Sequence, residues 1–325
     1  MNKLPISIIQ NSTIRSLDIP TSTCVKWVED GFKIKERVQM PAKMSVHPQG
    51  EDFITSMPCL LPENNGQQYF GLKVVSSIDG QIPNLHSEIY LYNSKNGHLL
   101  SIIDGDWITA MRTGAVAALA ARLFKKTDVN TYSIVGLGNI GSAVLNCLIN
   151  DNKGQKIKIR LMKYKNHAEQ IIDRYKSADN VDFEIVETHE DFFKKADVII
   201  SCVTVAPELL CPDNSWFKPG VTLIPVHVRG FQNCDLFFDK VFGDDTGQIQ
   251  TWKYFSQFRK YDEISRVLLG EIEGRENDDE RILSYNYGIA LHDIFFASKI
   301  FEEVQNKEVP KLMFEKESEK KWLTN

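Results

Sequence analysis

The 325-residue sequence predicts an α/β fold in which a doubly wound parallel sheet accompanies a second, α+β domain. From Thr131 onward, short apolar runs alternate with helical patterns, which is typical of a parallel sheet with crossover helices. Before Thr131, apolar runs are joined by turns rich in Gly, Asn and Pro, which indicates hairpins beside a helix. The length is sufficient for two domains, each with a core of its own.

The composition is that of an ordinary globular protein, and the net charge of −5 gives no indication of a nucleic-acid or membrane-surface partner. No apolar run is long enough to cross a bilayer, and the N-terminus lacks the apolar core of a signal peptide. The cysteines form neither a C-x-x-C pair nor a spacing with histidine that predicts a metal site. We therefore expect a cytoplasmic protein with free thiols and no metal; its cysteines are Cys24, Cys59, Cys147, Cys202, Cys211 and Cys234.

Apolar runs of strand length, separated by turn residues, fill most of the first third of the chain. Lys43 lies in one of them and Lys73 in another. Residues 93–97 carry the signature of a hairpin turn. The expected elements are strands at 6–9, 39–46, 53–60, 69–76, 89–92 and 99–103, and a helix at about 18–34.

Lys73 stands out because it interrupts an apolar strand. A lysine on an edge strand packs its stem against the sheet and keeps its ammonium group in water. A lysine turned into a pocket binds a carboxylate or exchanges a proton. The sequence supports these two interpretations equally.

Arg112 precedes an alanine-rich helix, residues 115–124, and is expected near the positive end of its dipole. A cation at that end is unfavourable unless an anion compensates it. One interpretation is a surface arginine paired with Asp106. The interpretation that we favour is a bidentate clamp for a substrate carboxylate.

The segment Gly136-Leu137-Gly138-Asn139-Ile140-Gly141 follows an apolar strand and opens an apolar helix. Its G-x-G-x-x-G spacing in this context is typical of the dinucleotide-binding turn of a Rossmann domain. Gly136 permits the tight turn, Gly138 lets the backbone approach a pyrophosphate, and Gly141 lets the helix pack on the strand. The N-terminus of the helix then offers N–H groups to the phosphates.

The next strand, residues 157–162, ends without the acidic residue that would hold a ribose 2′-hydroxyl group. Lys163 and Lys165 follow it, so the sequence favours NADP(H) over NAD(H), unless both lysines face solvent. Ligands of a doubly wound sheet bind beyond the carboxyl ends of its strands. We therefore expect the end of strand 197–204, with Ser201, Cys202, Val203 and Thr204, beside the nicotinamide.

His227 follows the strand at 220–226 at the same rim, next to Arg229. The sequence supports a catalytic and a structural role for this histidine equally. For Asp244 and Asp245, which follow another strand, a turn or helix cap is the simpler interpretation. The rest of the chain predicts a strand at 281–286, an amphipathic helix at 288–304 and a solvated or frayed tail at 311–321.

Together these segments resemble the ornithine cyclodeaminase/μ-crystallin family, which also holds alanine dehydrogenases, ketimine reductases and an opine-type dehydrogenase. The most specific match is the arginine–threonine segment with the strand lysine before it. The matching segments cover nearly the whole chain and are residues 71–75, 91–97, 108–116, 134–141 and 288–293.

The resemblance implies a homodimer and chemistry at the α-carbon of an amino acid or imino acid. It implies a substrate-binding and dimerisation domain (residues 1–115 and 305–325) and a Rossmann domain (116–304). Lys73 and Arg112 match the family's carboxylate-binding residues, whereas Lys43 replaces an arginine and lacks its bidentate fork. Residues expected at the cofactor are Thr113, Gly136, Gly138, Asn139, Ile140, Gly141, Lys163, Lys165, Cys202, Val203, Thr204 and His227.

The sequence departs from the cyclodeaminases in the loop after residue 226. Those enzymes carry an aspartate there, with a lysine shortly after it, whereas this chain has His227 and a polar segment up to residue 233. Cyclodeamination by the familiar route is therefore not expected. The basic, polar loop would suit an additional carboxylate on the substrate, as in an opine-type compound.

We therefore expect an NAD(P)H-dependent oxidoreductase that acts on the C–N bond of an imino acid or amino acid, with Lys73 or His227 moving the proton. Two alternatives remain open. One is an ornithine cyclodeaminase-like ammonia lyase with His227 in place of the aspartate. The other is a μ-crystallin-like protein that binds cofactor and a small ligand without turnover.

Overall fold

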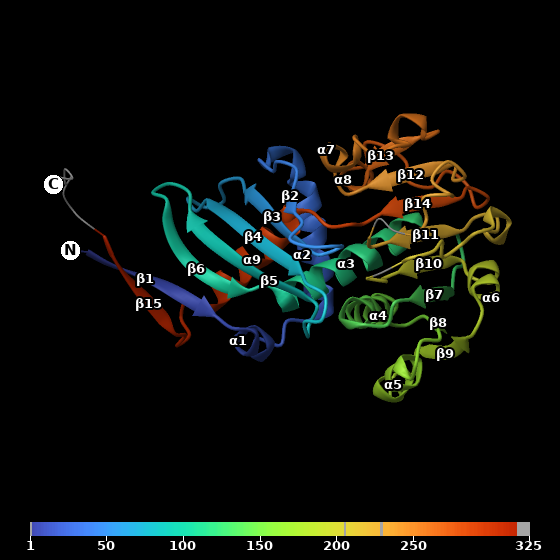
Figure 1. Cartoon of the computed structure of the whole chain (residues 1–325), viewed down its shortest axis with the longest axis horizontal. Helices are drawn as coiled ribbons and strands as arrows, with labels where there is room; N and C mark the ends of the chain where they lie inside the picture. The colour runs from blue at the N-terminus through green and yellow to red at the C-terminus, as the bar shows by residue number, and fades with distance from the viewer. Residues whose placement is uncertain (1, 205, 228–229, 317–325) are drawn as a thin grey trace. The chain divides into compact units, whose positions relative to one another are not determined.

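The computed structural model describes residues 2–204, 206–227 and 230–316, and the chain forms two compact units. Figure 1 shows the sheet and helices of each unit. Unit 1 comprises Met1–Ile19, Arg37–Thr109 and Ala290–Asn325; unit 2 comprises Pro20–Glu36 and Ala110–Ile289. The predicted α/β class with a Rossmann-type parallel sheet is confirmed.

Unit 1 is built on a seven-stranded sheet in the order β15-β1-β6-β5-β4-β3-β2. Neighbouring strands are antiparallel, except for the parallel pair β1–β6. The helix α9 packs on β3, β4 and β5 (Figure 1). The elements are β1 (Asn2–Ile9), α1 (Asn11–Ser16), β2 (Met44–Val46), β3 (Phe53–Leu60), β4 (Tyr69–Ser77), β5 (Leu85–Asn93), β6 (His98–Asp104), α9 (Ala290–Val304) and β15 (Lys311–Lys316).

Two expectations for this unit are wrong. Residues 311–315 are exposed, as expected of a solvated segment, but 311–316 are not a frayed end, because they form β15, which pairs antiparallel with β1 at the other end of the chain. The remainder of that tail lies outside the described residues. Lys43 lies in the loop before β2 rather than within a strand, because strand pairing to β3 begins only at Met44.

Unit 2 contains an eight-stranded sheet in the order β13-β12-β14-β11-β10-β7-β8-β9, and all neighbouring strands are parallel. The strand order reverses between β7 and β10, which is the switch point where a doubly wound sheet binds its ligand. The strands are β7 (Thr131–Val135), β8 (Ile157–Met162), β9 (Val181–Val186), β10 (Val198–Ser201), β11 (Thr222–Pro225), β12 (Lys240–Gly243), β13 (Tyr261–Glu263) and β14 (Ile282–Tyr285).

The helices around this sheet connect its strands or precede them in the chain (Figure 1). They are α2 (Thr21–Lys33), α4 (Asn139–Asp151), α5 (His167–Arg174), α6 (His189–Lys194), α7 (Thr246–Ile249) and α8 (Ile264–Leu268), while α3 (Asp106–Phe124) contains the division at Thr109. The expectation that this helix starts near Arg112 is wrong. It begins at Asp106, so Arg112 lies in its second turn, beyond the reach of the helix-end dipole.

The division into units differs from the expected domain limits at three helices; on α3 it falls at Thr109 and not at residue 115. The expected limits put residues 290–304 in the nucleotide-binding domain and residues 20–36 in the substrate domain. In the structure α9 packs on the sheet of unit 1, and α2 packs on α4 and α8 of unit 2. The contacts of each helix, rather than its place in the sequence, decide its unit.

All six cysteines are free and buried. Across the described part of the chain, we find no helix long and apolar enough to pass through a membrane. Nor do the described residues include a group of three His, Cys, Asp or Glu side chains arranged to hold a metal ion.

An aromatic core in unit 2 contains one buried acid. The hydroxyl group of Tyr285 donates a hydrogen bond to Asp235 Oδ1, and the Asp235 side chain is only 8% exposed. Burial raises the pKa of Asp235 to about 6. Because aspartates in unfolded chains titrate near pH 4, the folded protein holds this proton over a range in which the unfolded chain has released it. Through this group the free energy of unfolding falls between about pH 4 and pH 6 and stays lower above that range.

We predict that Asp235→Asn raises the free energy of unfolding at pH 8 by about 1–2 kcal/mol and changes it little at pH 4, because the amide needs no proton to stay neutral. Chemical denaturation at both pH values measures this difference. The exposed Asp179→Asn serves as the control. A gain at pH 4 as large as at pH 8 would contradict the prediction.

Candidate functional site

The glycine turn of unit 2 connects β7 to α4 as the sequence predicts. Gly136 has φ of +85°, and a Cβ there would overlap the backbone of Cys202 and Val203. A Cβ at Gly141 would overlap the carbonyl oxygen of Gly136. Both glycines are therefore required by close backbone approach: one joins the turn to the end of β10, the other seats the helix on the turn.

Gly138 differs, because a Cβ on it would meet no atom within 4 Å. It is exposed and is the N-cap of α4, followed by Asn139 and Ile140 in the first turn. That turn carries no acidic side chain. An open backbone surface at a helix N-terminus without a nearby carboxylate fits a pyrophosphate. The residues of this turn therefore fit the pyrophosphate of a dinucleotide.

The end of β8 presents two exposed lysines. Lys163 forms an ion pair of 2.8 Å with Glu187, which follows β9. The bond to Glu187 raises the pKa of Lys163 and lowers that of the carboxyl group. Lys165 has φ of +51°, and its ammonium group lies 5.2 Å from the centre of the Tyr164 ring. A carboxylate is thus present at this rim, supplied by a neighbouring strand rather than by β8.

His227, just beyond β11, is held by a residue of the adjacent strand. Its Nε2 atom forms a 2.7 Å hydrogen bond with Ser201 Oγ, at the end of β10. Ser201 is fully buried and His227 is half-buried. Ser201 therefore orients the imidazole ring. Cys202 is buried, Val203 half-buried and Thr204 exposed, whereas Arg229 lies outside the described residues.

Arg112 is only 6% exposed, which excludes the interpretation as a surface arginine. Gly288, with φ of +88°, lies against its guanidinium group: a Cβ on this glycine would come within 2.7 Å of Nη2. The fully buried Asp244 accepts hydrogen bonds from Gly288 N at 2.9 Å and from Asn286 Nδ2 at 2.8 Å. Asp244 is therefore more than a turn cap, because it fixes the loop that packs on Arg112.

Lys73 belongs to the buried face of β4, which α9 covers, as the alternation of buried and half-buried residues along this strand requires. The strand is internal, between β3 and β5, and Lys73 is 0% exposed, so the edge-strand interpretation is wrong. Its ammonium group donates to Thr109 Oγ1 at 2.7 Å and to Asp293 Oδ1 at 2.8 Å. Near Asp293, burial raises the pKa of the Cys59 thiol.

The structure thus groups the expected site residues within each unit. In unit 1, Lys73 is buried and Lys43 is half-buried. In unit 2, the glycine turn lies against Cys202 and Val203, and the buried Arg112 and Thr113 are neighbours on α3. The sequence indicated no role for Asp293, Thr109 and Asn286, and the only signal for them was their position in matching motifs or at a strand end.

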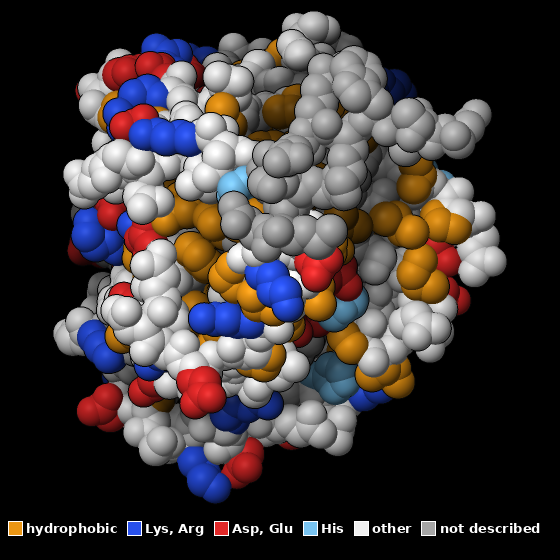
Figure 2. Space-filling view, turned by 90° about the vertical axis from the view of Figure 1, so that its left-hand side faces the viewer, with side chains coloured by type: hydrophobic (Ala, Val, Ile, Leu, Met, Phe, Trp, Pro, Cys, Tyr) orange, Lys and Arg blue, Asp and Glu red, His pale blue; other side chains and the backbone are white. Residues whose placement is uncertain are grey.

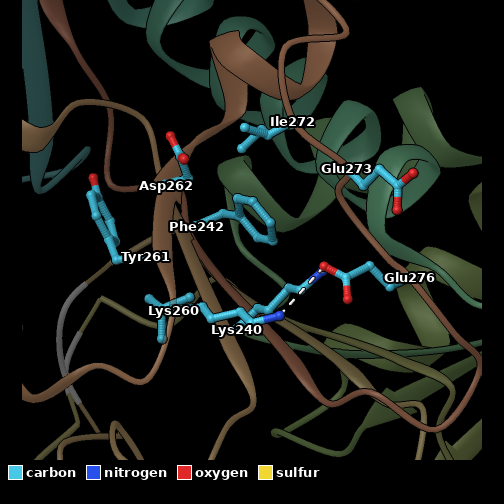
Figure 3. A pocket seen from close by; sticks show the side chains of 9 residues that line it. Lys240, Phe242, Lys260, Tyr261, Asp262, Ile272, Glu273 and Glu276 are labelled. Carbon is cyan, nitrogen blue, oxygen red and sulfur yellow. Dashed lines mark hydrogen bonds and ion pairs between the residues drawn. The ribbon is translucent and has the colours of Figure 1, made fainter.

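A cavity of about 470 Å³ in unit 2 is formed by β12, β13 and the loop 272–276 (Figure 3). Lys240 lines it and bonds Glu276 at 2.8 Å, Glu280 at 3.3 Å and the Gly274 carbonyl at 3.0 Å. All three ammonium donors therefore have protein partners. This lysine holds the acidic loop in place, and the cavity starts at the amino ends of the strands, away from the rim of the glycine turn.

Comparison with known proteins gives a match over almost the whole chain. The model described as the ornithine cyclodeaminase/mu-crystallin family matches residues 8–308. A Staphylococcus aureus N-((2S)-2-amino-2-carboxyethyl)-L-glutamate dehydrogenase is 25% identical over 238 residues, which cover 68% of this chain and 69% of that protein.

Two solved structures share the fold. The Δ1-pyrroline-2-carboxylate reductase of Thermococcus litoralis, in complex with NADH and L-proline, gives a TM-score of 0.80 at 21% identity, covering 94% of this chain and 99% of that one. An archaeal alanine dehydrogenase dimer with bound NAD also gives 0.80, at 19% identity, covering 95% and 99%. The fold expected from the sequence is therefore one that solved structures already show.

We predict opposite results for alanine at two glycines of the turn. Gly136→Ala introduces strain of about 1–3 kcal/mol and lowers the melting temperature, because of its positive φ and the backbone behind it. Gly138→Ala leaves the melting temperature unchanged but weakens NAD(P)H binding about tenfold or more, or about 1.4 kcal/mol, because its methyl group occupies the surface open to phosphate. Thermal unfolding and fluorescence titration measure the two effects. Wild-type affinity in Gly138→Ala would exclude a pyrophosphate at this turn.

Proposed function

This chain belongs to the ornithine cyclodeaminase/mu-crystallin family, and from that premise we propose that it is an NAD(P)H-dependent oxidoreductase acting on the C–N bond of an imino acid or amino acid. The observation that carries the proposal is the fully buried Lys73, held by Thr109 and Asp293. An ionisable group buried with a specific charge partner is costly, and such groups are concentrated at functional sites. In this proposal Lys73 of unit 1 serves the substrate, and the glycine turn of unit 2 binds the cofactor.

Arg112 and Lys73 bind the substrate carboxylate in this proposal, with Lys43 as a third cation. Arg112 supplies a bidentate fork, and the loop held by Asp244 limits its movement. Lys43, as a lysine, offers charge without a fixed fork. Fixing the carboxylate aligns the C=N group for reaction and supplies much of the rate by positioning alone.

The reduced nicotinamide supplies the hydride when the cofactor is bound. Lys73 and His227 are the two groups that exchange the proton of the substrate nitrogen, the first buried beside Asp293, the second oriented by Ser201. The cofactor-binding residues are those of the glycine turn (136–141), with Thr113 and the segment 202–204.

NADP(H) is the favoured cofactor, because Lys163 and Lys165 are exposed and no acidic residue occupies positions 162–166. Glu187 pairs with Lys163, but both side chains are largely in water, where solvent screening leaves such a pair little energy. A 2′-phosphate carries more charge than this carboxylate and would replace it as the partner of Lys163.

The protein is a homodimer and works in the cytoplasm in this proposal. Apolar side chains are exposed on both edge strands of unit 1: Met44 and Val46 on β2, and Met313 and Phe314 on β15. Figure 2 shows hydrophobic side chains in patches between charged ones on one face of the molecule. Exposed apolar edges favour pairing with another chain, and light scattering would measure the mass of the assembly. Six reduced, buried cysteines suit a reducing compartment.

The test of the function is the absorbance at 340 nm of NADPH and NADH with purified protein and a panel of cyclic imines, 2-oxo acids with amines, and amino acids. Oxidation of NADPH with one class of imine supports the proposal and identifies the substrate class. Proline and ammonia formed from ornithine without net cofactor change would support the cyclodeaminase instead. Cofactor binding without any turnover would support the binding protein.

We predict that Lys73→Met lowers kcat by about 10²–10⁴-fold, because it removes a proton donor as well as a carboxylate ligand. Steady-state kinetics on the substrate found in the panel measure it. The control for loss of a lysine is the exposed Lys95→Met, in the turn between β5 and β6. A raised KM with an unchanged kcat would reduce Lys73 to a binding group.

We predict that Gly288→Ala raises KM for the carboxylate substrate about tenfold or more and leaves the affinity for NADPH unchanged, since the methyl group displaces the Arg112 guanidinium. Gly154→Ala is a matched control, because Gly154 also has a positive φ (+92°) but a Cβ there meets no atom. If the two variants have the same KM, Gly288 does not position Arg112.

A further inference from the structure

Hydrogen-bonded side chains continue beyond Lys73 to the surface of unit 1. Thr109 Oγ1, which accepts from the Lys73 ammonium group, lies 3.0 Å from Ser87 Oγ. Ser87 Oγ lies 3.5 Å from Asp106 Oδ1, the longest step. His86 Nδ1 donates to Asp106 Oδ2 at 2.7 Å. Five side chains thus form one chain from a buried amine to an imidazole ring.

Exposure increases along this chain. Lys73 and Ser87 are 0% exposed and Thr109 is 6% exposed. The side chain of Asp106 is 26% exposed and that of His86 is 47% exposed. Each member both gains and releases a proton in one of its ordinary states, and no apolar group interrupts the sequence. The chain therefore connects the interior of unit 1 with water.

The local structure explains why these groups meet. On β5, Ser87 is on the buried face and its neighbour His86 points the other way, as strand alternation requires. On α3, Asp106 and Thr109 are three residues apart and share a face at the start of the helix. The first turn of α3 therefore contacts both faces of β5 through two side chains.

The proposed function leaves one requirement open. Each reduction of an imine adds a hydride from the cofactor to carbon and one proton to nitrogen. If Lys73 gives that proton, its neutral amine must regain one from water, and it has no exposed surface.

We propose that Thr109, Ser87, Asp106 and His86 form a relay that returns this proton to Lys73; this inference rests on the proposed function. An N–H bond of Lys73 breaks as the substrate N–H bond forms. His86 gives its Nδ1 proton to the Asp106 carboxylate, so an N–H bond breaks and a carboxylic O–H bond forms. The Asp106 carboxyl group then turns and gives this proton to Ser87 Oγ, Ser87 gives its own hydroxyl proton to Thr109, and Thr109 gives its own to the neutral amine of Lys73. Water restores the proton of His86, so one proton passes from water to the substrate and no residue changes its charge.

The charges around His86 suit a donor. The bond to Asp106 raises the pKa of His86, with further contributions from Asp106, Glu88 and Asp104. Glu88 Oε1 lies 3.2 Å from its Nε2. At the other end, Lys73 faces the Asp293 carboxylate and the hydroxyl group of Thr109. The relay thus starts at an imidazole ring beside two carboxylates and ends at an amine with a carboxylate beside it.

Asp106 also has a structural task, because its Oδ1 accepts from Ser87 N at 2.8 Å at the first residue of α3. A test must separate support of this helix from proton transfer. Thr109 allows it, since Thr109→Val keeps the shape and removes the hydroxyl group, whereas Thr109→Ser keeps the hydroxyl group.

The expected result is that Thr109→Val lowers kcat for reduction about 10–100-fold and increases the solvent deuterium isotope effect, while NADPH affinity and melting temperature stay near the wild type. Thr109→Ser restores both kcat and the isotope effect. Equal kcat and isotope effects in wild type and Thr109→Val, or failure of Thr109→Ser to restore them, would overturn the relay.

A second variant tests the exposed end, where folding is not at risk. His86→Gln lowers kcat about tenfold, and added imidazole restores it, whereas His98→Gln in the same sheet has no effect. In the cofactor-free protein, Asp106→Asn lowers the midpoint of the His86 ring titration followed by NMR. A His86→Gln enzyme with wild-type kcat at all pH values overturns the relay. Lack of turnover by the wild type is a different result, which refutes the proposed function itself.

Discussion

The ion pair between Lys73 and Asp293 is the interaction on which unit 1 depends. Both side chains are excluded from water, and they are 220 residues apart in the chain. Taking two charges out of water costs several kcal/mol per ion, which close geometry and further hydrogen bonds must offset. Removing either partner would leave an uncompensated buried charge. The pair therefore determines where α9 packs, and the C-terminal helix completes a sheet built from the first third of the chain.

Much of this fold follows from local patterns in the sequence. The limits of β3 and β8 are those predicted, because apolar runs bounded by turn residues end where strand pairing ends. The turn at Gly136 is also local, since positive φ and close backbone approach both demand glycine. These features arise from interactions within a few residues, so a single sequence is enough to predict them.

The features that the sequence did not predict depend on distant partners. β15 is a strand because β1 pairs with it, although its composition is that of a solvated tail. The start of α3 at Asp106 is fixed by the bond from Ser87 N, where helix propensity alone suggested a later start. The sequence left the role of Lys73 open for the same reason. Its burial depends on α9, and nothing near Lys73 in the sequence indicates Asp293.

The residues proposed to bind the substrate and those proposed to select the cofactor differ in how strongly the structure fixes them. The groups for the amino acid are buried and fixed by hydrogen bonds between distant segments, so a change at Lys73 or Asp244 alters stability as well as activity. Lys163 and Glu187, in contrast, form an exposed pair that solvent screens and that adds little to the stability of the fold. Substitutions at this rim can therefore change the selectivity between NAD(H) and NADP(H) without destabilising the fold. Substitutions of the buried groups that act on the substrate nitrogen cannot.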